Sequence, residues 1–357
     1  MTIHRAARAP GAMTGERAGS AASAAASTRS ALLLGAILVI LLLGALALGT
    51  LLGAVRIPMS ALPSAMSTPI ADWGPEETIL LQVRIPRVLT AALVGAGLAM
   101  AGVAMQTALR NPLAEPYLLG ISSGASFGAV CVILSGLAVA LPFAAFAGGL
   151  LALTATLVLG RMRGDAQATR VILAGVAVTA LFSAFTSLTI FQSRDSDSYR
   201  QVLHWLLGSL SSVTWESAGV ASGSLLIFGG ALVIVARLLD ILLLGDEEIH
   251  SLGLDVRRVR AGVLIAASLL AAGMVSVSGA IGFVGLIVPH IVRSILRLSQ
   301  RSLLVLSAIA GALLLVLADT FSRTVVAPQE LPVGITTSIL GAVVFAVIML
   351  RKREVGA

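Results

Sequence analysis

The chain has 357 residues, of which 57% are hydrophobic and 11% are charged, and its formal net charge is +7. Soluble domains are about 45–50% apolar and about 25% charged. This composition excludes an ordinary soluble enzyme, and it excludes a disordered protein, which needs many charged and few apolar residues. The mean hydropathy of +1.01 indicates a chain surrounded mostly by membrane lipid.

The positive charge does not indicate nucleic-acid binding. Lys352 is the only lysine, and no basic stripe with interleaved aromatic residues follows the chain. The single cysteine, Cys131, lies in an apolar run and is more typical of packing than of function. We therefore expect no nucleic acid, cofactor or metal ion to bind this chain.

Apolar stretches dominate the sequence. A bilayer core of about 30 Å needs about 20 apolar residues in a helix. Gly279, Gly282 and Gly285 divide one long apolar run in two. The sequence thus predicts an all-α polytopic membrane protein of about ten transmembrane helices. The expected spans are residues 31–55, 88–108, 117–137, 141–160, 171–192, 217–241, 261–279, 281–297, 302–322 and 332–350.

The two chain ends are polar. Residues 1–30 are rich in Ala, Ser, Gly and Arg, which predicts a disordered arm. The apolar stretch that follows is longer than the 7–15 residues typical of a signal-peptide core, so we expect it to be retained as a helix. If ten spans alternate from a cytosolic N-terminus, most arginines lie in the cytosol. We therefore place the arm and the tail, residues 352–357, in the cytosol.

Apart from His290 in the span 281–297, the expected spans carry no Asp, Glu, Lys, Arg or His near their middle. An ion-coupled transporter usually needs such a group inside the membrane. A phosphate-binding loop needs an internal lysine, which is absent, and the four histidines are scattered, so we expect no catalytic residues. These patterns favour a transport subunit driven by a separate motor. A faint similarity between the second and seventh spans leaves an inverted repeat open.

Three polar segments stand out. Arg84 and Arg87 are three residues apart at the start of the second span, which suits either an acidic docking partner or interfacial snorkelling. Residues 110–116 contain two prolines, which predict a rigid corner or a plain tight connection. Residues 246–252 predict a short amphipathic helix with Asp246 as N-cap. Its acidic start favours a protein partner over a membrane surface.

Together these motifs resemble the FecCD family of permeases, the membrane subunits of ABC importers for iron-siderophore complexes, heme and cobalamin. The resemblance covers residues 31–351. The segments that carry it are Arg84-Ile85-Pro86-Arg87 and residues 111–116, 119–125, 173–176, 205–210, 252–256, 279–290, 318–319 and 330–334.

The resemblance implies a ten-helix permease domain of the type II importer fold over residues 31–351. It also implies pairing with a second copy, two cytosolic ATPase subunits that hydrolyse ATP, and an external substrate-binding protein. The chain itself would then be a transport subunit rather than an enzyme. Its expected location is the bacterial cytoplasmic (inner) membrane, crossed several times with both termini in the cytosol.

The resemblance also assigns roles to individual residues. Arg84, Arg87 and Arg323 match outer arginines that meet acidic residues of the binding protein. Asn111 and Leu113 match an inner gate, and Ala168 and Thr169 align with a second gate element. The expected ATPase coupling helix consists of Asp246, Glu247, Glu248, Ile249, His250, Ser251 and Leu252.

The cargo is not specified by any path residue. We expect a bulky iron chelate, a ferric siderophore or heme, that crosses the membrane by alternating access. A cobalamin importer permease is the first alternative, and an ion-coupled secondary transporter is a second one of another class. A membrane enzyme would need a convergent polar cluster, and a structural scaffold would not need the outer arginine pair.

Overall fold

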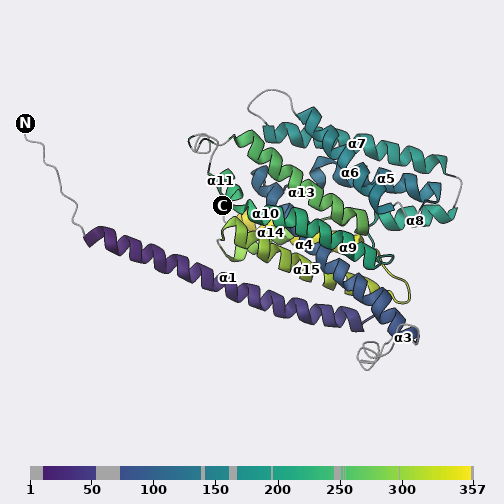
Figure 1. Ribbon diagram of the computed structural model, residues 1–357, viewed down its shortest axis with the longest axis horizontal. Coiled ribbons are helices and arrows are strands. Elements are labelled where there is room, and N and C mark those ends of the chain that lie inside the picture. Colours follow the sequence, from purple (N-terminus) through teal and green to yellow (C-terminus); the bar gives the residue numbers. More distant parts are fainter. Residues whose placement is uncertain are drawn as a thin grey trace, which may run out of the picture.

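The computed structural model describes residues 11–53, 73–137, 141–160, 167–193, 196–244, 251, 253, 255–296 and 298–354. Over these ranges the ordered elements are helices, without a strand. Most of them run side by side as one bundle (Figure 1). The prediction of an all-α polytopic protein is confirmed.

All ten expected spans coincide with helical segments. Among the described residues, seven helices are long and apolar enough to cross a membrane, and three shorter apolar helices accompany them. The single-helix spans are α1 (Gly11–Leu51), α4 (Ile85–Ala108), α5 (Ile121–Ser135), α6 (Leu141–Gly160), α7 (Gln167–Gln192), α13 (Val256–Ser278), α14 (Val284–Ile295), α15 (Gln300–Thr324) and α16 (Val333–Glu354). The sixth expected span is a succession of α9 (Trp215–Ser224), η5 (Leu225–Gly229), α10 (Gly230–Ile234) and α11 (Ala236–Leu242).

Short segments precede or join these helices. The segments α3 (Pro75–Thr78) and η2 (Ile79–Arg84) lead directly into α4, and η3 (Pro116–Leu119) leads into α5. The helix α8 (Ser196–Leu206) lies between the expected spans 171–192 and 217–241, where no helix was predicted. The predicted division of the long apolar run is confirmed, because α13 ends at Ser278 and the left-handed Gly279 (φ +67°) follows.

Helix α4 lies at the centre of the bundle and is buried along most of its length. It packs against α15, α13, α14 and α9. Small residues make this packing close: a Cβ atom at Gly102 would overlap the carbonyl of Gly285 in α14, and one at Gly95 would overlap that of Gly311 in α15. The glycines of α4 therefore serve close helix packing.

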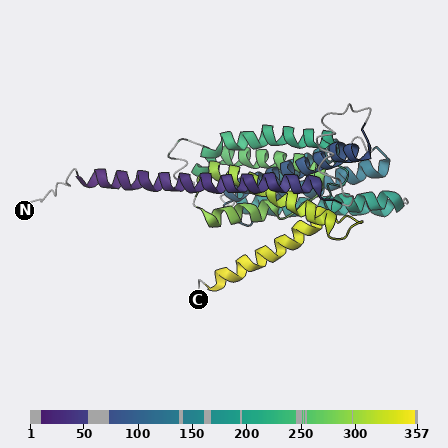
Figure 2. The same ribbon diagram turned by 90° about the horizontal axis from the view of Figure 1, so that it is seen from below.

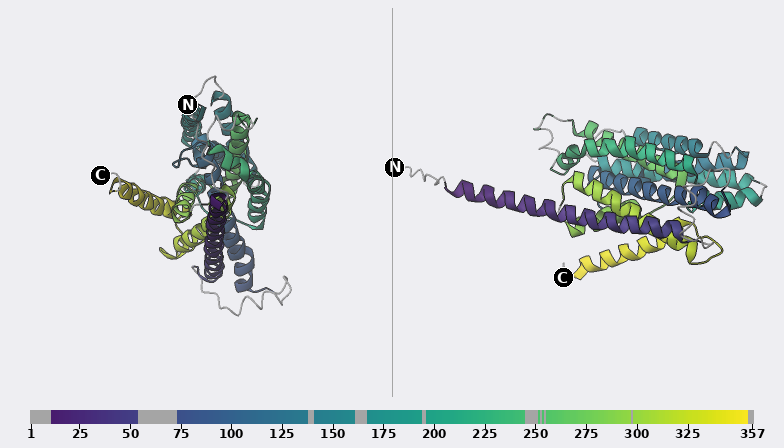
Figure 3. Two further views of the ribbon diagram at one scale, coloured as in Figure 1. Left: turned by 90° about the vertical axis from the view of Figure 1, so that its left-hand side faces the viewer. Right: turned by 60° about the horizontal axis from the view of Figure 1, so that its bottom comes forward.

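Helices α1 and α16 lie at the periphery. Helix α1 packs along α15, and its N-terminal part extends beyond the bundle (Figures 1 and 2). Helix α16 leans away from the other helices (Figures 2 and 3). Both expose large apolar side chains, such as Ile40 (69% exposed) and Ile339 (62% exposed), which suits contact with lipid. The N-terminal part of α1 and the C-terminal end of α16 lie at the same end of the bundle (Figure 2).

The N-terminal arm differs from the prediction. We expected disorder over residues 1–30, but α1 begins at Gly11 and continues without a break into the first span. The arm is rich in alanine, which has the highest helix propensity of any residue, and a stable apolar helix follows it directly. Propensity and continuity therefore outweigh the low hydrophobicity that suggested disorder.

Candidate functional site at the outer end of the bundle

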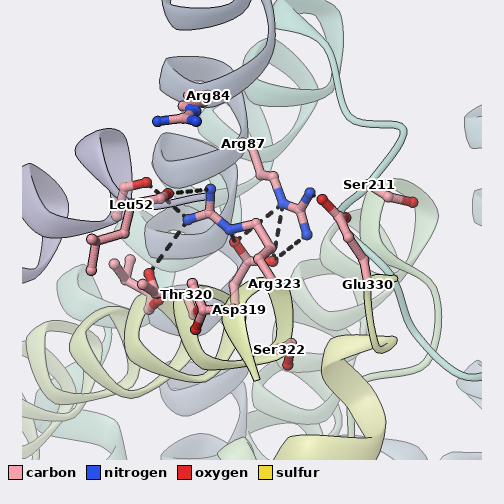
Figure 4. A network of polar contacts seen from close by, with 12 residues as sticks. Leu52, Arg84, Arg87, Ser211, Asp319, Thr320, Ser322, Arg323 and Glu330 are labelled. Carbon is pink, nitrogen blue, oxygen red and sulfur yellow. Dashed lines mark hydrogen bonds and ion pairs between the residues drawn. The ribbon is translucent and has the colours of Figure 1, made fainter. Parts of the chain in front are cut away.

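The three arginines predicted to dock a partner come together at one end of the bundle (Figure 4). We call this the outer end, because the sequence analysis placed these residues outside the membrane. Arg84 ends η2, Arg87 lies in the first turn of α4, and Arg323 lies in the last turn of α15. Each is at most 5% exposed. Neither snorkelling nor free surface exposure describes them.

Asp319 is the centre of this cluster. Its carboxylate accepts from Nε and Nη2 of Arg87, at 3.1 and 2.9 Å, and forms an ion pair with Nε of Arg323 at 3.1 Å. The Asp319 side chain is 1% exposed. A buried charge is stable only when it is paired and hydrogen-bonded, and here one carboxylate serves two guanidinium groups.

Glu330 completes the cluster from the loop between α15 and α16. Its carboxylate accepts from Nη1 of Arg87 at 2.7 Å. The Glu330 side chain is 34% exposed, whereas the Arg87 side chain is 6% exposed. Glu330 is thus the member of the cluster of Arg84, Arg87, Asp319, Arg323 and Glu330 that reaches the surface.

Arg84 and Arg323 also close the C-terminal end of α1. The last carbonyl groups of a helix have no partner within the helix and carry the negative end of its dipole. The Nη1 atom of Arg84 donates to the carbonyls of Thr50 and Leu51, at 3.1 and 2.7 Å. Arg323 donates through Nη2 to the carbonyl of Gly49 at 2.9 Å and through Nη1 to that of Leu52 at 3.3 Å.

Sequence reasoning missed the acids and the carbonyls of this cluster. Asp319 lies four residues before Arg323, a spacing that places both on one helix face. That spacing was a usable signal for their ion pair. No local pattern could reveal that Arg87 and Glu330 meet, because 243 residues separate them.

The first expected gate pair lies in the corner between α4 and η3. The Oδ1 atom of Asn111 accepts from the backbone N–H of Leu113 at 2.9 Å, and the Asn111 N–H donates to the carbonyl of Gln106. Leu113 is 50% exposed and lines an apolar hollow together with residues of α14 and α16, among them Ile287 and Phe345. Leu113 thus lies at an apolar surface between three segments, and its gating role remains a prediction.

The second expected gate element and the expected coupling helix are the other predicted features of the inner end. Ala168 and Thr169 lie in the first turn of α7, where Thr169 is exposed. In the described part of the chain, no hydrogen bond joins them to Asn111 or Leu113. Of the expected coupling helix, only Ser251 belongs to the described residues. The remainder, residues 246–250 and 252, lies outside them.

A second polar network ties α4 to α14 and α15 at the opposite, inner end. Arg293 donates to Oε1 of Gln106 at 2.5 Å and to Oγ1 of Thr107 at 3.4 Å. Thr107 donates to Gln300 at 3.0 Å, and the N–H of Gln300 donates to Asp240 at 2.9 Å. We call Arg293, Gln106, Thr107 and Gln300 the inner network. No pattern in the sequence had indicated this network.

The corner after α4 also holds the break between α13 and α14. The Tyr117 hydroxyl donates to the carbonyl of Ile281 at 2.7 Å and accepts from its N–H at 3.1 Å. The carboxylate of Glu115 accepts from the N–H of Phe283, a residue with φ +68°. Burial raises the pKa of Glu115, and the Phe283 N–H opposes this shift. The rigid corner predicted from its prolines is therefore also an anchor.

The fold is that of an all-helical protein with several apolar helices long enough to cross a membrane. The model of the FecCD transport family matches residues 31–351, so the chain belongs to the FecCD transport family, and the resemblance noted in its motifs is confirmed.

Two relatives and one solved structure are similar over nearly the whole chain. The hemin transport system permease protein HmuU of Yersinia pestis is 42% identical over 340 residues, which are 90% of this chain and 96% of the relative. The cobalamin import system permease protein BtuC of Halobacterium salinarum is 39% identical over 305 residues, which are 84% of this chain and 81% of the relative. An inward-facing structure of a metal-chelate type ABC transporter has a TM-score of 0.77 at 30% identity and covers 90% of this chain and 99% of that one.

Proposed function

We propose that this chain is the permease subunit of an ATP-driven importer that moves a bulky iron chelate, a ferric siderophore or heme, across the bacterial cytoplasmic membrane. Its family, and its similarity to a hemin permease and to a metal-chelate transporter, support the importer class and the cargo. A cobalamin importer permease is the second candidate, favoured by the 39% identity to a cobalamin permease.

The distribution of buried charge carries the mechanistic part of the proposal. Within the described ranges, the buried ionisable side chains are those of Arg84, Arg87, Asp319 and Arg323, and all four belong to the outer cluster. Ion coupling usually requires a titratable group part-way across the membrane. This distribution supports a motor outside the chain rather than an ion-coupled secondary transporter.

The proposed cycle needs three partners. A second copy of the chain completes the translocation path as a homodimer, and two ATPase subunits bind the coupling helix, residues 246–252. A loaded binding protein docks at the outer end through the cluster that contains Arg84, Arg87 and Arg323. ATP binding then switches the subunits between outward-open and inward-open forms, with Asn111, Leu113, Ala168 and Thr169 at the inner gate.

Uptake into vesicles tests this proposal. The full complex, with its ATPase and binding protein, should accumulate hemin or a ferric siderophore only when ATP is enclosed on the ATPase side. Cobalamin, supplied in the same assay, decides between the two candidate cargoes. Accumulation by the chain alone under a proton gradient would refute the proposal, and vesicles with an ATPase that cannot hydrolyse ATP are the control.

The coupling role of residues 246–252 has its own test. Deletion of this segment should release the ATPase from the purified complex, because its contact surface is removed. An equally tight complex after deletion would refute the assignment. Deletion of residues 1–10, at the N-terminus, is a control that should leave the ATPase bound.

A further inference from the structure

We propose that Glu330 is an internal substitute for a partner's carboxylate, and that an acidic side chain of the docking protein displaces it from Arg87. This inference deepens the proposed docking function and rests on it. It assigns different roles to the residues of the outer cluster. Asp319 forms a fixed core, whereas the carboxylate bound to Nη1 of Arg87 can be either that of Glu330 or that of the partner.

The charges of the cluster point to such a position. Arg84, Arg87 and Arg323 carry three positive charges, and Asp319 and Glu330 carry two negative charges. When Glu330 leaves, Arg87 and Arg323 share the single carboxylate of Asp319, and Arg84 adds a third buried positive charge. A buried cation without a paired anion is unfavourable, so the position vacated by Glu330 attracts another carboxylate.

Geometry shows which of the two acids can exchange. Asp319 lies within α15, is 1% exposed, and pairs with both Arg87 and Arg323. Glu330 lies in a loop, is 34% exposed, and pairs with Arg87 through Nη1. Partly exposed ion pairs are weak because water and salt screen them. Glu330 can therefore leave at a much lower cost than Asp319.

Arg87 keeps its orientation after the exchange. Its Nε and Nη2 atoms remain bound to Asp319, and both hold the plane of the guanidinium group. The Nη1 atom then stays directed toward the position that Glu330 occupied (Figure 4). An arginine fixed in this way presents a preorganised donor to an incoming carboxylate.

The location of Glu330 connects docking to the last helix. Glu330 lies three residues before α16, which begins at Val333. The adjacent Leu331 N–H donates to the carbonyl of Ser322 at 3.1 Å, so the start of α16 remains attached to α15 when Glu330 moves. The exchange thus changes the contacts of the loop without detaching the helix that follows it.

The recognised partner surface is therefore an acidic protein surface that offers an Asp or Glu side chain. Removal of Glu330 should tighten the complex, because the partner's carboxylate no longer competes. We expect Glu330→Gln to lower the Kd for the binding protein that supports uptake by about tenfold. The exposed Glu216, in the first turn of α9, gives the control variant Glu216→Gln, which should leave the Kd unchanged.

Chemical rescue tests the anion position without any partner. Glu330→Ala should lower the melting temperature of the full chain in detergent, and acetate should restore it more than chloride at equal ionic strength. Wild type and Glu216→Ala should not distinguish the two salts. Equal effects of acetate and chloride on Glu330→Ala would overturn the proposed anion position.

The outcomes separate this inference from the proposed function. If the wild type binds its partner and Glu330→Gln binds with the same or a weaker affinity, the exchange is refuted while docking stands. If the wild type does not bind the protein that supports uptake, docking at this site is refuted and the exchange with it. Tighter binding by Glu330→Gln together with acetate rescue of Glu330→Ala would support both.

Discussion

The two ends of α4 hold their neighbours in different ways. At the outer end, Arg87 binds two carboxylates, and Asp319 joins it to Arg323 of α15. At the inner end, Arg293 of α14 reaches the side chains of Gln106 and Thr107, which are both neutral. The same helix is thus fastened by ion pairs on one side of the membrane and by hydrogen bonds to neutral groups on the other.

This difference indicates which end can rearrange. Removing one partner of a buried ion pair costs about 3–5 kcal/mol, because an uncompensated charge remains. A hydrogen bond between a charged and a neutral group contributes about 1.5–3 kcal/mol, and one between neutral groups about 1 kcal/mol. The inner network can therefore open and close at a lower cost, while the outer cluster keeps α1, α4 and α15 together. Three variants test this contrast.

The largest effect is expected for Asp319→Asn. This variant leaves Arg87 and Arg323 buried with Glu330 as their one remaining acid in the cluster, and it should lower the free energy of unfolding by about 3–5 kcal/mol. Thermal unfolding of the purified chain in detergent measures the loss. The exposed N-cap Asp255 of α13 provides the control, since Asp255→Asn removes an acid without burying an unpaired charge. Equal stability of Asp319→Asn and wild type would contradict a fixed outer core.

A smaller effect is expected for Arg293→Met, which removes the charged member of the inner network and keeps most of the apolar stem. The loss in unfolding free energy should be about 1.5–3 kcal/mol, because neutral acceptors are left behind rather than a buried charge. The same unfolding assay compares it with Asp319→Asn. If Arg293→Met proved the more damaging variant, the contrast between the two ends would be reversed.

The smallest effect concerns the pH dependence of stability at the corner after α4. Burial raises the pKa of Glu115, so between the unfolded and the folded pKa the folded chain binds more protons than the unfolded chain. Wild-type stability should therefore fall as pH rises through this window, and Glu115→Gln should abolish this component.

Melting temperatures recorded over a series of pH values measure this component as the difference between wild type and Glu115→Gln. As pH rises, the melting temperature of Glu115→Gln should increase relative to that of the wild type. A difference that stays constant with pH would contradict the assignment. The exposed Glu76 of α3 supplies the matched control, Glu76→Gln.

The sequence was sufficient to place the spans, because a lipid environment requires about 20 apolar residues per crossing, whatever the neighbours of each helix are. It also indicated the break at Gly279, because three glycines within seven residues interrupt a helix. It was wrong about residues 11–30, where low hydrophobicity suggested disorder but the alanine-rich segment continues the helix that follows. It did not predict α8 as a helix.

The candidate site was predicted only in part. The sequence singled out Arg84, Arg87 and Arg323, and the structure places them in one cluster. It could not show that two of them close the end of α1, nor that Arg87 binds Asp319 and Glu330. The inner network escaped prediction for the same reason, since Gln106 and Arg293 are 187 residues apart.

The sequence by itself determined that this protein is a membrane-embedded helical subunit of the FecCD type, because hydrophobicity, glycine breaks and family motifs are local properties of the chain. Only the tertiary structure decided which charges neutralise one another and which end of α4 is held more tightly. Pairing depends on distances between segments far apart in sequence, and no local pattern encodes those distances.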